Sequence, residues 1–201
     1  YVNTSATDYF NKSYTLFNYD VARKFNSVYV VEGYMDALSL VQAGVPNVVA
    51  AMGTAFGDTH LSCLKGKSVT LALDNDIPGQ SHTYNIIMNH KDIPFEVVRP
   101  YTYKDFNEAL LAEADVKKLV NDTVPAPLFV IKHLASSLDL KTVDARKELW
   151  KSLAILIGSP VDDEFRKLYP LNTLYTPYEH DYYWTIADRI VKGKRLKKGG
   201  N

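Results

Sequence analysis

Four short apolar runs, separated by segments with helical spacing, constrain the fold of this chain more than any other feature. The runs are rich in β-branched residues and read VYVVE (28–32), NVVAA (47–51), SVTLALD (68–74) and FEVVR (95–99). Continuous apolar runs of this kind are typical of strands buried on both faces of a sheet. Their alternation with helical segments over short links indicates βαβ units with right-handed crossovers. We therefore expect an α/β fold with a parallel sheet flanked by helices.

The segments between and after these runs predict the helices. Met35, Leu38 and Val41 recur at helical spacing, and Gly44 marks the end of that helix. The expected helices cover residues 34–43, 58–65, 78–90, 104–120, 129–138, 142–157, 161–169 and 179–192. Asp58 or Thr59 would cap the second of these helices, and a turn at 76–80 leads into the third.

The alternation of strands and helices ends near Pro100, and only helical patterns follow from about residue 129. We expect a lead-in segment at 1–27, an α/β domain at 28–122 and a C-terminal helical subdomain at 123–201. The chain begins in mid-pattern at Tyr1, so we expect it to be a piece of a longer protein.

Charge and composition narrow the classes of function. The chain has 23 basic and 23 acidic residues, so its net charge of zero gives no indication of nucleic-acid binding. Any contact with nucleic acid must therefore be made by a local group of residues. Its single cysteine, Cys63, cannot form a disulfide framework or a zinc site, which fits a reducing compartment. The sequence shows no signal peptide and no apolar run of membrane-spanning length. We expect a cytoplasmic protein with no membrane partner.

Carboxylates stand where a parallel sheet places its ligands. Glu32 ends the first apolar run, Asp74 ends the third, and Asp76 follows two residues later. Because ligands bind beyond the carboxyl ends of such strands, we expect Glu32, Asp74 and Asp76 to converge on one crevice. Clustered carboxylates repel one another unless a cation neutralises them, and hard oxygen ligands select Mg²⁺ or Mn²⁺. The pattern predicts a divalent-metal site that can support phosphoryl transfer.

Four segments of the chain stand in an informative order. They are VNTSATDYFNKSYTLFNYDVAR (2–23), EGYMD (32–36), MGTAFGDTHL (52–61) and LALDNDIPGQ (71–80). Together they resemble the lead-in segment, the Glu-Gly signature, the Gly-Thr-Ala loop and the Asp-x-Asp signature of the Toprim catalytic domain in DnaG-type DNA primases. The resemblance runs from residue 2 to about 110, and the helical remainder agrees in character with that family's C-terminal subdomain.

The resemblance implies roles for individual residues. Glu32 would be the essential acid, as a metal ligand or a proton-transfer group, and Asp74 and Asp76 would be metal ligands. Asp105 matches the first acid of a further acidic motif, and Asn107 replaces its second acid, as in phage and mobile-element primases. Gly33 would keep the metal crevice free of a side chain. The other residues assigned to support of the site, or to nucleotide or template contact, are Lys12, Asp36, Gly53, Thr54, His60, Gly79 and Lys104.

The function implied by this resemblance is that of a primase core. Such a core is a DNA-directed RNA polymerase that uses Mg²⁺ or Mn²⁺ to join nucleoside triphosphates on a single-stranded DNA template. The replicative helicase would be a partner through regions outside this chain. Three alternatives stay open: a Toprim nuclease or topoisomerase, a non-catalytic Toprim module that binds nucleic acid or a partner, and a flavodoxin-like domain with surface acids. Histidines other than His60, among them His82, lack metal-ligand spacing and are interpreted as structural or solvated.

Overall fold

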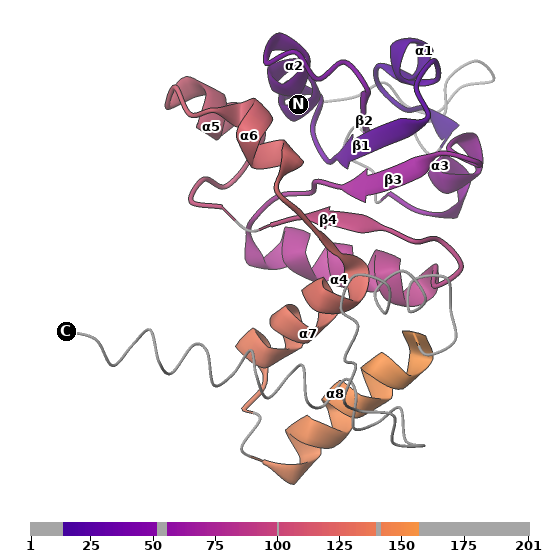
Figure 1. The fold of residues 1–201 in the computed structure, drawn as a ribbon, viewed down its shortest axis with the longest axis vertical. Coiled ribbons are helices and arrows are strands. Elements are labelled where there is room, and N and C mark those ends of the chain that lie inside the picture. Colours follow the sequence, from indigo (N-terminus) through magenta and orange to yellow (C-terminus); the bar gives the residue numbers. More distant parts are fainter. Residues whose placement is uncertain (1–13, 52–55, 100, 140–141, 157–201) are drawn as a thin grey trace, which may run out of the picture. The chain divides into compact units, whose positions relative to one another are not determined.

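The computed structural model describes residues 14–51, 56–99, 101–139 and 142–156 (Figure 1). The strands are β1 (Ser27–Val31), β2 (Val48–Ala50), β3 (Ser68–Leu71), β4 (Glu96–Val98) and β5 (Thr123–Pro125). The helices are α1 (Tyr19–Ala22), α2 (Tyr34–Gln42), α3 (Asp58–Cys63), α4 (Ile77–Asn89), α5 (Phe106–Leu111), α6 (Val116–Asn121), α7 (Ala126–Ser137) and α8 (Val143–Leu156). The helices expected at 161–169 and 179–192 lie outside the described residues.

The strands form one sheet in the order β2-β1-β3-β4-β5. The pairs β1–β2, β1–β3 and β3–β4 are all parallel, and Val30 of β1 lies opposite both Val49 and Leu71. This confirms the parallel sheet that the apolar runs predict. The sequence did not predict β5, because three residues that end in a proline carry no alternating pattern.

Several element boundaries differ from the expected ones. β3 ends at Leu71 rather than at residue 74, although Ala72 still donates a backbone hydrogen bond of 2.8 Å to Val30. The helix expected at 104–120 is two helices, α5 and α6, separated near Glu113, whose φ is 56°. The N-cap of α3 is Gly57 rather than Asp58 or Thr59. The lead-in segment contains α1, and α7 begins before the expected residue 129.

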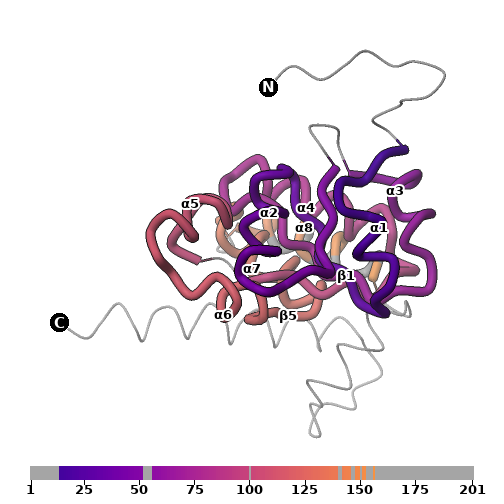
Figure 2. The backbone as a smooth tube through the Cα atoms, turned by 90° about the horizontal axis from the view of Figure 1, so that it is seen from above, coloured from indigo at the N-terminus to yellow at the C-terminus, as the bar shows by residue number. Residues whose placement is uncertain are grey.

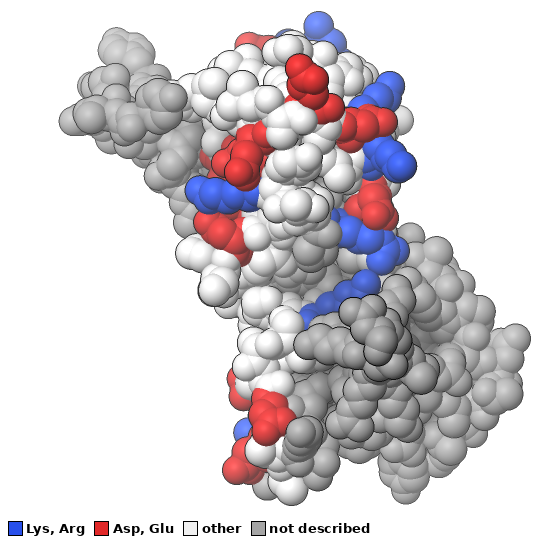
Figure 3. Space-filling view, turned by 90° about the vertical axis from the view of Figure 1, so that its left-hand side faces the viewer, with Lys and Arg blue, Asp and Glu red and all other residues white. Residues whose placement is uncertain are grey.

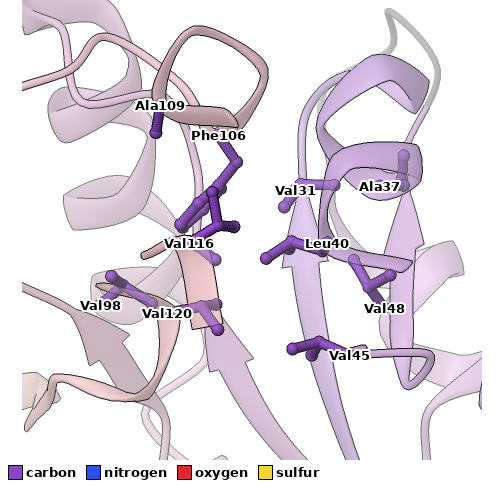
Figure 4. Packing of buried hydrophobic residues seen from close by; sticks show 12 residues of the cluster. Val31, Ala37, Leu40, Val45, Val48, Val98, Phe106, Ala109, Val116 and Val120 are labelled. Atoms are coloured by element: carbon purple, nitrogen blue, oxygen red, sulfur yellow. The ribbon is translucent and has the colours of Figure 1, made fainter. Parts of the chain in front are cut away.

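A cluster of buried apolar side chains joins β1 and α2 to α5 and α6 (Figure 4). Val31 and Leu40 come from the first pair of elements, and Phe106, Val116 and Val120 point toward them from the second. Full burial of one such large side chain contributes roughly 1.5–3 kcal/mol to folding. The cluster therefore fixes α5, and the loop before it, over the same face of the sheet as α2.

The end of α2 has the hydrogen bonds of a Schellman motif. The N–H of Gly44 donates to Val41 at 3.0 Å, and the N–H of Val45 donates to Leu40 at 2.9 Å. Leu40 and Val45 are both buried, which is the hydrophobic contact that usually accompanies this motif. The predicted end of the helix at Gly44 is confirmed.

Residues of the lead-in segment pair with β2. Phe17 and Ala50 exchange two backbone hydrogen bonds of 2.9 and 3.3 Å. The side-chain amide of Asn18 donates to the carbonyls of Pro46 and Val48 at 3.0 and 2.8 Å. α1 then lies beside α3, where the Tyr19 hydroxyl donates to the Cys63 carbonyl at 3.0 Å (Figure 2). The first described residues are thus part of the α/β unit.

The described chain divides into two compact units. One holds the residues up to 86 together with 95–124, and the other holds 87–94 and the residues from 125 onward. In the second unit α7 packs against α8, and most of α7 is buried and apolar, with Pro127 in its first turn. Among the described residues, no helix is long and apolar enough to cross a bilayer.

At the first turn of α4, the backbone of Gly79 lies very close to the backbone of Asp74. Asp76 precedes the helix, and its Oδ1 accepts the N–H of Gly79 at 2.9 Å. Pro78 stands in the first turn, where its missing N–H is harmless, as the sequence predicts. A Cβ atom on residue 79 would overlap the Asp74 carbonyl oxygen and lie 2.8 Å from the carbonyl carbon. Only glycine therefore lets α4 begin directly against the backbone of Asp74.

We expect Gly79→Ala to destabilise the fold by about 2 kcal/mol, because α4 or the Asp74 backbone would have to move. A thermal melt should show a Tm lower by roughly 4 to 8 °C. Asn85→Ala is the control, since Asn85 is exposed on the same helix and alanine is a good helix former. Equal melting temperatures for the two variants would contradict the close approach.

Candidate functional site

The acids predicted for the site lie at one end of the sheet. Glu32 directly follows β1, Asp74 comes three residues after the end of β3, and Asp76 precedes α4. β1 and β3 are neighbouring parallel strands, so their carboxyl ends reach the same side of the sheet. No group of three His, Cys, Asp or Glu side chains within the described ranges is close enough to hold a metal ion. The expected convergence of the three acids is therefore incomplete in this structure.

The environment of Asp74 strongly disfavours its charged form. Only 20% of its side chain is exposed, and its pKa is raised to about 6. Burial is the largest cause of this rise, followed by the negative charges of Glu32 and Asp36. The negative charge of Glu32 thus raises the pKa of Asp74, although the two carboxylates are not part of a closed metal-binding group.

Lys104 places a positive charge beside Asp74 and Asp76. Its Nζ lies 3.5 Å from Asp74 Oδ2 and 3.8 Å from Asp76 Oδ2. The charges of Asp74 and then Asp76 raise the pKa of Lys104, so the ammonium group stays charged at neutral pH. The structure therefore brings together three of the residues that the sequence assigns to the site.

Glu32 lies beside His82 of α4, which sequence reasoning missed. His82 Nδ1 is 3.7 Å from Glu32 Oε1, and the interaction with Glu32 raises the pKa of His82 while burial acts in the opposite direction. This distance is longer than a hydrogen bond, so we attribute the attraction to charge. Glu32 Oε1 is buried and has no hydrogen-bond partner. The sequence held no signal for this pair, because the two residues come from different βα units.

Asp36 connects α2 to the start of α5. Its buried Oδ1 accepts the N–H groups of Phe106 and Asn107, each at 3.1 Å. A Cβ atom on residue 33 would lie 2.8 Å from Asp36 Oδ2. Gly33 thus leaves room for the Asp36 carboxylate, and its expected role in keeping a metal crevice clear stays a prediction.

Asn75, the middle residue of the Asp-x-Asp motif, holds the loop that carries Lys104. Its backbone N–H donates to the Lys104 carbonyl at 2.7 Å. Its side-chain amide donates to the carbonyls of Tyr101 and Tyr103, the latter at 3.2 Å, and its Oδ1 accepts from Gln80 at 3.3 Å. Sequence reasoning missed this role as well, although an amide between two acids could have drawn attention to the position.

Asp105 and Asn107 contribute to the start of α5. Asp105 Oδ1 caps the helix by accepting the N–H of Glu108 at 2.7 Å, while its charge adds to the rise in the pKa of Asp74. The Oδ1 of Asn107 accepts from the Ser39 hydroxyl at 3.4 Å. The role of Asp105 as a metal ligand stays a prediction.

The remaining predicted site residues are His60, Lys12, Gly53 and Thr54. His60 is buried, and its ring stacks on Phe56 with centroids 5.5 Å apart and planes 10° apart. This contact is part of the packing around α3. Lys12, Gly53 and Thr54 lie outside the described residues.

The oxygen atoms at this end of the sheet fit Mg²⁺ or Mn²⁺ in chemistry. The carboxylates of Glu32, Asp74 and Asp76 are hard anionic donors, which these cations prefer. The buried Glu32 Oε1 without a partner would be satisfied by a cation, and so would the buried charge of Asp74. Figure 3 shows one face of the molecule, on which acidic and basic side chains of the described residues are interspersed.

Comparison with known proteins agrees with the predicted fold. A family model described as Toprim-like matches residues 29–110. A DNA primase of Lactococcus lactis subsp. lactis is 45% identical over 93 residues, which are 43% of this chain and 15% of that protein. A DNA primase of Mycoplasma pneumoniae is 32% identical over 167 residues, or 78% of this chain and 26% of that protein.

A solved structure gives the same result for the fold. The RNA polymerase domain of Mycobacterium tuberculosis primase DnaG, in complex with a double-stranded DNA oligomer with a 6-nucleotide overhang, superposes with a TM-score of 0.65 at 26% identity. The match covers 83% of this chain and 59% of that domain. The chain spans about a quarter or less of the length of the two primases compared above. Residues 29–110 of this chain are thus Toprim-like, and the chain is similar in sequence to DNA primases and in fold to the RNA polymerase domain of a DnaG primase.

Proposed function

We propose that this chain is the catalytic core of a DNA primase, a nucleotidyltransferase that synthesises RNA primers on single-stranded DNA for replication. One observation carries the proposal: Asp74, Asp76 and Lys104 meet at the carboxyl end of β3, within a Toprim-like domain. The related proteins are DNA primases, which favours primer synthesis over the strand cleavage of a nuclease or topoisomerase. Three acids at strand ends also argue against a module that only binds DNA or a partner.

In this proposal Glu32, Asp74 and Asp76 hold Mg²⁺ or Mn²⁺, with Asp105 as a further ligand. The bound ion would neutralise phosphate charge and activate the primer 3′-hydroxyl toward the α-phosphate of the incoming nucleotide, with pyrophosphate leaving. Lys104 offers an ammonium group for phosphate oxygens in the same place.

The residues around these acids act by positioning. Asp36 fixes the start of α5, and Gly33 and Gly79 leave the space that Asp36 and Asp74 need. Asn107 supplies a neutral oxygen where many relatives would have a second acid. We further propose that Lys12, Gly53 and Thr54 contribute to nucleotide or template contact, and that His60 has a supporting role through its packing against Phe56.

We propose single-stranded DNA and nucleoside triphosphates as the partners of this core. The Mycobacterium tuberculosis domain was crystallised with DNA, which supports a template contact in this chain. The replicative helicase would be bound by regions outside these residues, and the bacterial relatives support a cytoplasmic site of action. Residues 28–122 would form the catalytic domain, 1–27 its lead-in segment and 123–201 the helical subdomain.

We expect the chain to bind Mn²⁺ in calorimetric titrations and Asp74→Asn to weaken this binding by at least about tenfold, because one anionic oxygen ligand is lost. A nucleoside triphosphate should tighten Mn²⁺ binding in the wild type. Asp20→Asn is a matched control, since the Asp20 side chain is 96% exposed on α1. Identical Mn²⁺ binding by all three proteins would contradict a metal site at Asp74.

Asp74→Asn should also stabilise the metal-free protein at neutral pH. The folded-state pKa of Asp74, about 6, lies above the ordinary value of about 3.9, so folding favours the protonated form. The stability that this protonated group contributes is complete below pH ~4 and is lost as the pH rises through 6. Asparagine stays neutral throughout, so the free energy of unfolding of the variant should exceed that of the wild type at pH 7.5 by roughly 3 kcal/mol and match it near pH 4.

Urea denaturation in the presence of EDTA at the two pH values measures this difference. A stability difference that is the same at pH 4 and pH 7.5 would show that the substitution acts through packing rather than through the charge of Asp74.

A further inference from the structure

Lys104 is held in place by contacts on both sides of its backbone. Its carbonyl accepts the N–H of Asn75 at 2.7 Å, and its own N–H donates to the Glu108 carboxylate at 2.6 Å. The Asn75 side chain also binds the carbonyls of Tyr101 and Tyr103, so the loop before α5 is fastened to the Asp-x-Asp motif at several points. The base of the lysine is therefore fixed while its side chain stays 56% exposed.

The ammonium group of Lys104 lies beside carboxylates that are proposed to hold a divalent ion. It contacts one oxygen each of Asp74 and Asp76, two of the proposed metal ligands. Mg²⁺ needs its oxygen ligands at about 2.0–2.1 Å in near-octahedral geometry, and Mn²⁺ also prefers six oxygen ligands. The ammonium group and a divalent ion bound by these two carboxylates would be like charges at close range, so each opposes the binding of the other. Metal binding therefore favours the departure of Lys104, which its long and half-exposed side chain allows.

The charges around the lysine explain why it rests there. The Asp74 side chain is only 20% exposed, and the ammonium group of Lys104 lies 3.5 Å from its Oδ2. The same ammonium group also lies beside Asp76, so a single basic side chain serves both acids of the Asp-x-Asp motif. Without a metal ion, this ammonium group offsets the repulsion among the acids.

We propose that Lys104 is the resident counter-cation of Asp74 and Asp76. A divalent ion displaces its ammonium group, which then binds the triphosphate that arrives with that ion. The inference deepens the proposed function and rests on it. A triphosphate brings negative oxygens to the cation displaced from Asp74 and Asp76, so the lysine exchanges one anionic partner for another. Lys104 then opposes binding of the free metal and favours binding of the metal–nucleotide complex, which makes the two ligands cooperative.

The test compares two calorimetric titrations of the full chain, one with free Mn²⁺ and one with a preformed 1:1 Mn²⁺–ATP complex. Lys104→Met keeps the length of the side chain and removes its charge. We expect this variant to bind free Mn²⁺ roughly three- to tenfold more tightly than the wild type and Mn²⁺–ATP roughly three- to tenfold more weakly. Lys104→Arg should keep the wild-type order of affinities, because it keeps the charge.

Lys65→Met is the matched control, because Lys65 is exposed and precedes β3, at the end of that strand opposite the acids. It should leave both affinities unchanged. A thermal melt in EDTA tests the same role without metal. Introducing Lys104→Met should lower the Tm of the wild-type protein more than that of the Asp74→Asn variant, which lacks the carboxylate charge that Lys104 offsets.

The outcomes separate this inference from the proposed function. If Asp74→Asn loses Mn²⁺ binding but Lys104→Met binds free Mn²⁺ like the wild type or more weakly, the counter-cation role is wrong and the metal site stands. If the wild type and Asp74→Asn bind Mn²⁺ equally, the metal site is wrong and the inference fails with it. Opposite changes in the two affinities for Lys104→Met support both.

Discussion

The buried carboxylate of Asp36 is the interaction on which the arrangement of the site depends. Its Oδ1 accepts the first two N–H groups of α5, and Asp105 accepts the third, so two acids satisfy the start of that helix. A negative charge at a helix N-terminus is favourable, which offsets part of the cost of burying Asp36. Because α5 is fixed in this way, the loop that precedes it can bring Lys104 to the acids at the end of β3.

Much of this fold could be predicted because its signals are local. The apolar runs at β1 to β4 and the helical spacing of α2 lie within single segments of the chain, and so do the acids that follow the strands. The short strand β5 and the break near Glu113 could not be predicted, because they depend on packing against elements elsewhere. Periodicity indicates the elements, and tertiary contacts decide where they stop.

The same distinction applies to the site. Glu32 and Asp74 are recognisable from their places after strands, but the pairing of Glu32 with His82 joins two βα units and leaves no mark in the sequence. Asn75 stands inside the motif, yet its partners lie in the loop before α5. No group of three acids close enough to hold a metal ion occurs among the described residues, and the ammonium group of Lys104 lies within 3.8 Å of both Asp74 and Asp76. Sequence therefore identifies the charged groups, and the structure adds which neighbours balance them.

The pairing of Phe17 with Ala50 has a consequence for how the domain can be divided. Among the described strands β2 is the last on its side of the sheet, and an uncovered edge strand offers its backbone groups to other chains. Phe17 occupies part of that edge, and the Asn18 amide occupies the carbonyls of Pro46 and Val48. A shortened protein that began at β1 would keep every proposed metal ligand but leave this edge open to self-association. The lead-in residues thus cover part of the edge of the sheet in addition to preceding β1 in the chain.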